Sequence, residues 1–124
     1  MMPPASKPDI LLRPRIRIGD AITFGSGKID LLRKVGETQS ISAAARALSL
    51  PYKRAWLLID SLNRGFGRPL IETSAGGKGG GGAHLTPLGE QLIKRYDALE
   101  ASLTLHAAEE LRALRDLALP GIDR

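Results

Sequence analysis

The sequence has no cysteine, and aromatic residues make up only 4% of its 124 positions. The absence of cysteine excludes disulfide scaffolds, thiol catalysis and zinc sites of the cysteine type. No apolar run reaches the roughly 18 residues that a membrane span requires. The opening stretch "MMPPASKPDI" lacks the apolar segment of a signal peptide. We therefore expect a cytoplasmic protein, without a membrane contact, whose core is built mainly from Leu, Ile, Val and Ala.

Histidine is also scarce, since only His84 and His106 are present. These two residues lack convincing metal-ligand spacing, and no Ser/His/Asp constellation is indicated. The sequence therefore predicts no catalytic residue, no metal site and no cofactor in this chain, which argues against an enzyme.

Negative charge is sparse in the first part of the chain. Residues 1–70 hold 12 Lys and Arg against 5 Asp and Glu, a net charge of +7, whereas residues 71–124 hold 6 against 8, a net charge of −2. One basic and one mildly acidic part favour a surface directed at a polyanion such as nucleic acid.

Four parts can be distinguished along the chain. Residues 1–9 are rich in proline and are expected to form a disordered tail. Residues 10–25 contain polar/apolar alternation over 15–18, which predicts a strand, followed by Gly19-Asp20 as a two-residue hairpin turn and a return strand over 21–24. The other two parts are residues 26–97, a helical and β-hairpin region, and residues 98–124, the outer part of a long helix.

Apolar residues at helical spacing predict three helices between residues 26 and 66. Ser26 is the expected cap of the first, Ser40 or Ser42 of the second, and Ser49 of the third, with Pro51 in its first turn. The second helix has an alanine-rich face, and a link of about three residues separates it from a third helix with a polar face. This is the pattern of a helix-turn-helix, although many small helical bundles share it.

A glycine tract over residues 76–82 lies between short strands expected at 70–73 and 83–85. A phosphate-binding loop requires Ser or Thr after the lysine, but Gly79 follows Lys78. A dinucleotide fingerprint must open a helix directly after a strand, whereas here a second strand intervenes. An inert linker remains an alternative. The position after the third helix favours the β-hairpin wing of a winged helix-turn-helix, with Lys78 at its tip.

A long helix is expected after Thr86, which is a good cap, and Pro87, which suits the first helical position. Its apolar pattern continues for about 30 residues, or about 45 Å if the helix is unbroken. Such a helix needs a partner, and a second copy of itself is the simplest one, with the seam formed by Leu99, Leu103, Leu111 and Leu114. The alternative is a break near Thr104 with the tail folding back. The expected fold class is therefore mostly α with a small β wing: a winged helix-turn-helix with a long C-terminal dimerisation helix and a short N-terminal β-hairpin.

Two segments carry a family resemblance. "SISAAARALSLPYKRAWLLIDSLN" and "TSAGGKGGGGAHLTPLGEQLIKRYDALE" closely resemble the N-terminal DNA-binding domain of ModE, the molybdate-responsive transcriptional regulator, over roughly residues 26–100. A looser similarity to LysR-type regulators covers the helix-turn-helix and "LTPLGE". The resemblance implies a homodimer that binds a palindromic operator in double-stranded DNA and controls molybdenum genes.

The C-terminus departs from the family pattern. Full-length members continue into molybdate-binding β-barrel domains, whereas no strand-rich segment follows the helix here. We expect the chain to lack its own sensor, so molybdate would act only through a separate binding protein or a full-length relative.

Nine residues are candidates for DNA contact. Tyr52, Lys53 and Arg54 begin the third helix, where side chains reach base edges or phosphates. Trp56 either lies over the groove or packs in the core, and Ser40 and Ser42 either contact phosphate or simply cap the second helix. Lys78 and the amides of Gly79 and Gly80 would contact the DNA backbone at the wing. A protein-interaction module remains the main alternative function.

Overall fold

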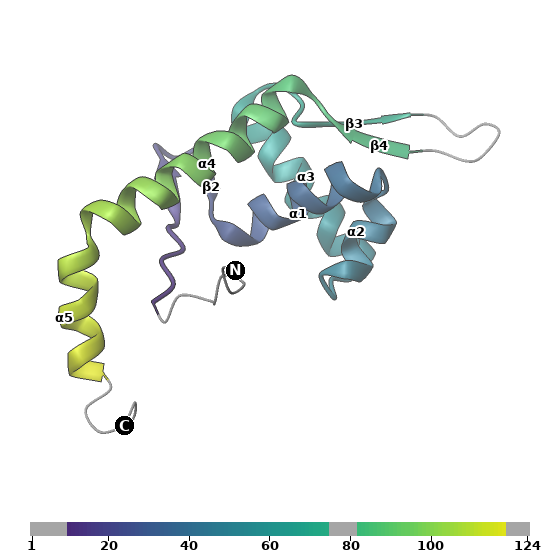
Figure 1. The fold of residues 1–124 in the computed structure, drawn as a ribbon. Helices are drawn as coiled ribbons and strands as arrows, with labels where there is room; N and C mark the ends of the chain where they lie inside the picture. The colour runs from purple at the N-terminus through teal and green to yellow at the C-terminus, as the bar shows by residue number, and fades with distance from the viewer. Residues whose placement is uncertain (1–9, 75–81, 119–124) are drawn as a thin grey trace, which may run out of the picture.

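A computed structural model describes residues 10–74 and 82–118 of the protein (Figure 1). The expected tail over 1–9, the wing tip with Lys78, Gly79 and Gly80, and the end of the chain lie outside these described residues. The elements follow in the order β1 (Ile16–Ile18), β2 (Ile22–Phe24), α1 (Ser26–Thr38), α2 (Ile41–Ala47), α3 (Tyr52–Phe66), β3 (Ile71–Ser74), β4 (Gly82–Leu85), α4 (Pro87–His106) and α5 (Ala108–Ala118).

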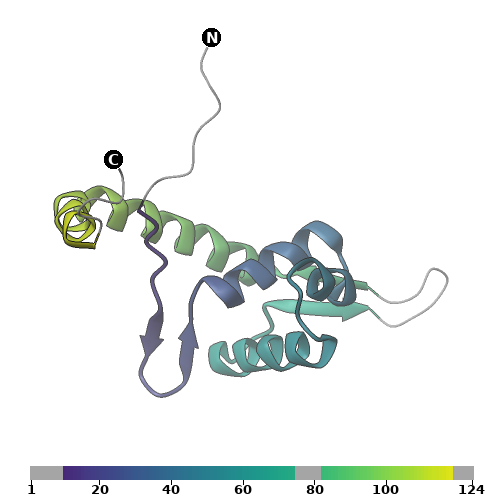
Figure 2. The same cartoon turned by 90° about the horizontal axis from the view of Figure 1, so that it is seen from below.

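Helix α1 is the centre of the fold. It contacts α2, α3 and α4, and Figure 2 shows it between α4 on one side and α3 on the other. Its apolar stripe predicted Ile29, Leu32 and Val35 as buried, and all three have no exposed surface; Leu31 is equally buried. Four buried positions in one helix allow it to pack against neighbours on several sides.

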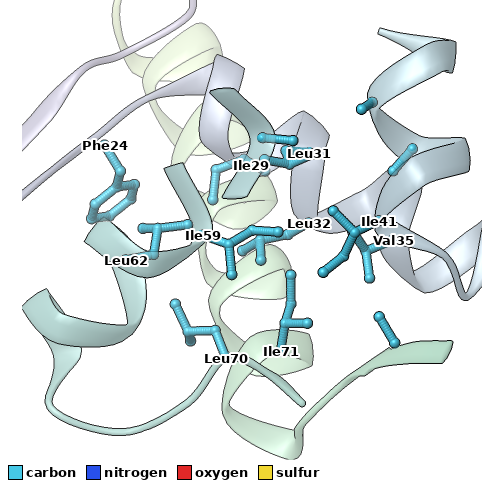
Figure 3. Packing of buried hydrophobic residues seen from close by; sticks show 14 of the residues in the cluster. Phe24, Ile29, Leu31, Leu32, Val35, Ile41, Ile59, Leu62, Leu70 and Ile71 are labelled. Atoms are coloured by element: carbon cyan, nitrogen blue, oxygen red, sulfur yellow. The ribbon is translucent and has the colours of Figure 1, made fainter. Parts of the chain in front are cut away.

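The remaining core comes from short contributions of β2, α2, α3, β3, β4 and α4 around α1 (Figure 3), whereas α5 has no buried residue. Ala44 and Ala45 of α2 are buried as expected, and their small side chains allow α2 to approach α1 closely. The other buried apolar residues are Phe24, Ile41, Ala55, Ile59, Leu62, Leu70, Ile71, Ala83 and Tyr96.

Two antiparallel hairpins flank this core, as the sequence predicted. In the first, Ile16 pairs with Phe24 and Ile18 with Ile22. The expected two-residue turn is wrong, because three residues, 19–21, connect the strands, with Gly19 at a φ of 57°. The hairpin packs on α3 through Gly65, where a Cβ would stand 3.0 Å from the carbonyl oxygen of Ala21.

Two predicted helix caps are wrong. Gly25 occupies the cap position of α1 without a side-chain hydrogen bond, and Ser26 is already helical. Ser49 does not cap α3; it has a φ of 57° and its amide donates to the carbonyl of Arg46 at 3.1 Å, so it ends α2. Pro51 takes the cap position of α3, where its missing N–H leaves no donor unsatisfied.

The start of α4 agrees with the sequence. The Thr86 hydroxyl accepts a hydrogen bond from the Gly89 amide at 3.1 Å and donates to the carbonyl of Pro69 at 2.8 Å. The Thr86 amide donates to the carbonyl of Leu70 at 3.0 Å. One residue therefore caps α4 and ties it to the segment that enters β3.

The C-terminal helix is divided, so the expectation of one continuous helix is wrong. A break close to Thr104 is present, as the alternative expected, but α5 does not fold back along α4. α4 ends at His106, Ala107 has a ψ of 14°, and α5 starts at Ala108. Figure 1 shows α5 turning away from the axis of α4. Nδ1 of the His106 ring lies 2.8 Å from the carbonyl oxygen of Ser102. In a regular α-helix, the backbone amide of residue 106 donates its hydrogen bond to this same carbonyl.

Candidate nucleic-acid interface

The link between α2 and α3 orients the first turn of α3. Ser40 caps α2 by accepting a hydrogen bond from the Ala43 amide at 3.0 Å. At the other end of α2, the Leu50 amide donates to the carbonyl of Ala45 at 2.8 Å, which closes the turn. α3 then begins at Tyr52 with its inward face formed by Ala55, Ile59 and Leu62. The helix-turn-helix predicted from the sequence is present.

The outward face of α3 is opposite this buried stripe. Lys53, Leu57, Asp60 and Arg64 follow one another at three- or four-residue spacing, and all are exposed. Arg64 pairs with Asp60 at 2.9 Å, whereas the exposed Leu57 presents 52% of its surface. Lys53 is thus the first charged side chain on this outward face, and the exposed Leu57, which was not among the predicted contacts, follows it one turn later.

Tyr52, Lys53 and Arg54 do not form one patch, although the sequence places them side by side. Successive residues of a helix project about 100° apart. Tyr52 lines a hollow toward the wing, whereas Arg54 lines a cavity on the other side of α3. Lys53 stands between them.

The hollow toward the wing, which we call the wing hollow, has a volume of about 360 Å³. It lies among the start of α2, the first turns of α3 and the base of the β3–β4 hairpin. Its lining includes Ser40, Ser42, Tyr52, Trp56, Thr73 and Gly82. Four of the residues predicted to contact DNA therefore surround one concavity, together with Thr73 and Gly82, which the sequence analysis missed.

Trp56 lies at the rim of the wing hollow and not in the core. It exposes 38% of its surface and makes an edge-on contact with the Tyr52 ring, with centroids 6.3 Å apart. Ser40 uses its hydroxyl to cap α2, whereas the exposed Ser42 hydroxyl accepts a hydrogen bond from Arg46 Nη1 at 3.0 Å. The Ser42–Arg46 pair adds one positive charge beside the start of α2.

The wing base is attached to the helix-turn-helix by the backbone. The Ala83 amide donates to the carbonyl of Gln39 at 3.1 Å, and Gln39 has a φ of 57° at the end of α1. Thr73 pairs with Ala83 and Ser74 with Gly82 in the antiparallel register. This bond places the hairpin beside α2, so the wing continues the surface formed by α2 and α3.

Lys28 and its neighbours form a second basic group. The Lys28 ammonium donates to the carbonyl of Thr23 at 2.8 Å and to the Ser61 hydroxyl at 3.3 Å. Burial, together with the charges of Arg15 and Arg54, lowers the pKa of Lys28 below its ordinary value. The sequence analysis did not select Lys28, and no local motif identifies it.

The four leucines expected in the dimer seam occupy different environments. Leu99, Leu103 and Leu111 are half-buried, whereas Leu114 exposes 61% of its surface. Leu105 and Leu117, which were not selected, are exposed at 73% and 78%. α4 and α5 therefore present a larger apolar surface than the predicted seam.

Residues 27–90 match the family described as bacterial regulatory helix-turn-helix protein, lysR family. The chain belongs to this family. The matched residues run from the first turn of α1 to the first turn of α4 and so contain the whole winged helix-turn-helix.

Individual relatives confirm the resemblance to ModE. The chain is 45% identical over 102 residues to the molybdenum-pterin-binding protein MopB of Rhodobacter capsulatus, covering 73% of this chain and 38% of that protein. It is 47% identical over 72 residues to the transcriptional regulator ModE of Yersinia pestis, covering 58% and 27%. The chain thus spans well under half the length of these two relatives.

Solved structures support the fold. A LysR family transcriptional regulator superposes with a TM-score of 0.51 at 20% identity, covering 67% of this chain and 27% of that one. In the described stretches 10–74 and 82–118, no helix is long and apolar enough to cross a membrane. The same stretches contain no group of three or more His, Asp or Glu arranged to hold a metal ion.

Proposed function

We propose that this protein is a sequence-specific DNA-binding transcriptional regulator of the ModE type, which places α3 in the major groove of a palindromic operator. The observation that carries this proposal is the wing hollow, because the first turns of α3, the start of α2 and the base of the wing meet there on one surface. A helix with its N-terminal turn at the base edges and flanking elements at the phosphates is the docking geometry of this motif.

Base reading is assigned to the exposed ridge of α3. Lys53 stands at the N-terminal end of this ridge, where a lysine can donate to guanine O6 and N7. Leu57 follows one turn later and offers an apolar contact of the kind that a thymine methyl group makes.

Contacts with the DNA phosphate backbone are assigned to the start of α2 and to the wing. Ser42 and Arg46 form a hydroxyl–guanidinium pair beside the start of α2, whose helix dipole favours an anion. Lys78, Gly79 and Gly80, which lie outside the described residues, are the proposed contacts at the tip of the wing, between the paired strands β3 and β4. The net charge of +7 over residues 1–70 supports this polyanionic partner.

A homodimer is the proposed assembly, with α4 and α5 as its contact surface. Leu114 and Leu117 of α5 are exposed and Leu103 of α4 is half-buried, so the two helices offer apolar side chains to a second copy. A two-fold dimer presents two copies of α3 related by symmetry, and a palindromic operator is the DNA sequence that matches this arrangement. The similarity to a molybdenum-pterin-binding protein, MopB, and to a transcriptional regulator, ModE, supports control of molybdenum-related genes.

A protein-interaction module is the second candidate. The exposed Leu105 favours it, because this residue is not among the leucines of the proposed dimer surface and could receive a different chain. In that case the partner protein binds to the end of α4, and α3 is not the binding surface.

The deciding experiment is an anisotropy titration with a labelled duplex from upstream of the protein's own gene and a scrambled duplex of the same composition. We expect a clear preference for the first duplex at physiological salt. Lys53→Gln should reduce this preference by about 1–3 kcal/mol, whereas Lys94→Gln, the same change on the exposed surface of α4, should not. Equal binding of the two duplexes by the wild type would favour the protein-interaction module. Repeating the titration with molybdate tests whether the oxyanion acts on this chain.

A further inference from the structure

A cavity of about 490 Å³ lies on the side of α3 away from the wing hollow, between the first hairpin, the start of α1 and α3. We call it the basic cavity, because Arg13, Arg15, Lys28 and Arg54 are among its lining residues. These residues come from the segment before β1, from α1 and from α3, so only the folded chain brings them together.

Among the described residues, three of these four cations have no carboxylate partner. Arg13 pairs with Asp30 at 3.1 Å. In the part of the chain that the structure describes, no ion pair joins Arg15, Lys28 or Arg54 to an acidic side chain. Three positive charges around one cavity repel each other, and an anion between them would remove that repulsion.

Lys28 is held in position to donate to such an anion. Its ammonium group has three protons, and two hydrogen bonds, to the Thr23 carbonyl and the Ser61 hydroxyl, fix its direction. One proton is left for a ligand. Burial is the main cause of the lowered pKa of Lys28, and the charges of Arg15 and Arg54 lower it further.

The start of α1 adds backbone donors to the same cavity. Gly25, Ser26 and Gly27 line it, and Gly25 provides no side-chain cap. The first amides of a helix have no partner within the helix. The first turn of α1 also contains no acidic residue that would compete with an anion.

We propose that the basic cavity binds a phosphate-type oxyanion, which Arg15, Lys28 and Arg54 hold from three sides. The oxyanion is either a backbone phosphate of bound DNA or a free inorganic anion. A DNA source rests on the proposed function: a helix in the major groove has a phosphate backbone along each side, and the wing hollow and the basic cavity lie on opposite sides of α3. The binding of a free anion does not depend on that function.

The first arm of the test uses the protein alone. Backbone amide NMR shifts are followed during titration with inorganic phosphate, against chloride at the same ionic strength. We expect saturable shifts at residues 25–28 and a rise in the pKa of the Lys28 ammonium. Arg15→Gln and Arg54→Gln should each weaken phosphate binding about tenfold, the effect of losing one charge-assisted hydrogen bond.

Arg17→Gln is the matched control, because it removes the same charge two residues along the chain from Arg15, at a position that pairs with Asp20 and does not line the cavity. It should change phosphate binding by less than about twofold, as expected for a screened surface charge. An equal loss in Arg17→Gln and Arg15→Gln would show general charge attraction and overturn the proposal.

The second arm identifies the source by measuring duplex affinity against salt concentration. If the anion is a DNA phosphate, Arg15→Gln and Arg54→Gln weaken binding to all sequences and reduce the salt slope by about 1 each. If phosphate binds but Arg15→Gln leaves duplex affinity unchanged, the cavity serves a free oxyanion. If neither arm responds to Arg15→Gln, the proposal is wrong. A wild type that binds no duplex contradicts the proposed function alone, and the phosphate arm then decides.

Discussion

Arg33 of α1 binds the carboxylate of Asp97 of α4 through both of its terminal nitrogens, although the two residues are 64 positions apart in the sequence. Nη1 donates to Oδ2 at 3.0 Å, and Nη2 donates to Oδ1. One residue before Asp97, the Tyr96 hydroxyl donates to the carbonyl of Pro14 at 2.7 Å. These bonds fix the direction of α4 relative to the helix-turn-helix, so the outer helices leave the domain at a defined angle.

The Arg33–Asp97 pair should make stability depend on pH. The hydrogen bond from Arg33 is the main cause that lowers the pKa of Asp97 below its ordinary value of 3.8. A carboxyl group with a depressed pKa in the folded state stabilises the fold above its unfolded pKa, and the contribution is lost as the pH falls through the folded value. Asp97→Asn should lower the free energy of unfolding at neutral pH by no more than about 1 kcal/mol, because both side chains are partly exposed.

Urea unfolding followed by circular dichroism at neutral pH and below pH 3.8 checks this expectation. The difference between wild type and Asp97→Asn should shrink at the lower pH. Asp20→Asn, at a fully exposed hairpin position, is the control and should change neither curve. A constant difference at both pH values would mean that the ion pair does not cause the loss.

Trp56 should report on occupation of the wing hollow. It is the only tryptophan in the chain, and it exposes 38% of its surface at the rim. DNA against the wing and the first turns of α3 would cover the ring, so we expect a blue shift of its emission and weaker quenching by acrylamide. Tyr52→Phe keeps the edge-on ring contact and should respond like the wild type. Unchanged quenching with DNA demonstrably bound would place the duplex elsewhere.

Gly89 should not tolerate a side chain. A Cβ at this position would overlap the carbonyl oxygen of Leu70, because α4 starts directly against the segment entering β3. Gly89→Ala should therefore cost about 1–3 kcal/mol of stability. Gly27 in the first turn of α1 is the matched control, since a Cβ there meets no atom within 4 Å.

Gly27→Ala should raise stability by up to about 1 kcal/mol, because alanine loses less backbone entropy than glycine in a helix. Thermal melts of both variants give the comparison. Equal melting temperatures for the two would contradict the close packing of α4 on Leu70.

The outer leucines should control dimerisation. Leu114→Glu places a charge on the apolar side of α5 and should raise the dimer dissociation constant at least about tenfold, since the burial of a leucine contributes about 1.5–3 kcal/mol. Ala101→Glu introduces the same group at an exposed position on α4 and should leave the mass unchanged. Sedimentation equilibrium measures both. A wild type that is monomeric at all concentrations would remove the dimer from the proposal.

Local patterns in the sequence predicted most of the elements, because each depends on neighbours a few residues away. The apolar stripe with Ile29, Leu32 and Val35, the cap at Ser40 and the Thr86-Pro87 start of α4 were all found where expected. The caps at Ser26 and Ser49 were wrong, since a serine before a helical pattern fits several positions equally well. The turn over residues 48–51, which forms in the folded chain, places Pro51 and not Ser49 at the cap position of α3.

The division between α4 and α5 was harder to predict from the sequence. The stretch from Thr104 to Ala108 contains neither glycine nor proline, so no breaker residue marks Ala107. The break was therefore only an alternative in the sequence analysis.

What the sequence determined by itself is the winged helix-turn-helix and its family, because helical periodicity, turn residues and a long motif are properties of contiguous residues. The tertiary structure decided which functional side chains meet. It separated Tyr52 from Arg54, since 200° of helix rotation lies between them and each faces a different concavity. It joined Arg54 to Arg15 and Lys28, because the hairpin and α1 pack beside α3. Pairing between distant residues depends on how the elements pack, and no local pattern records it.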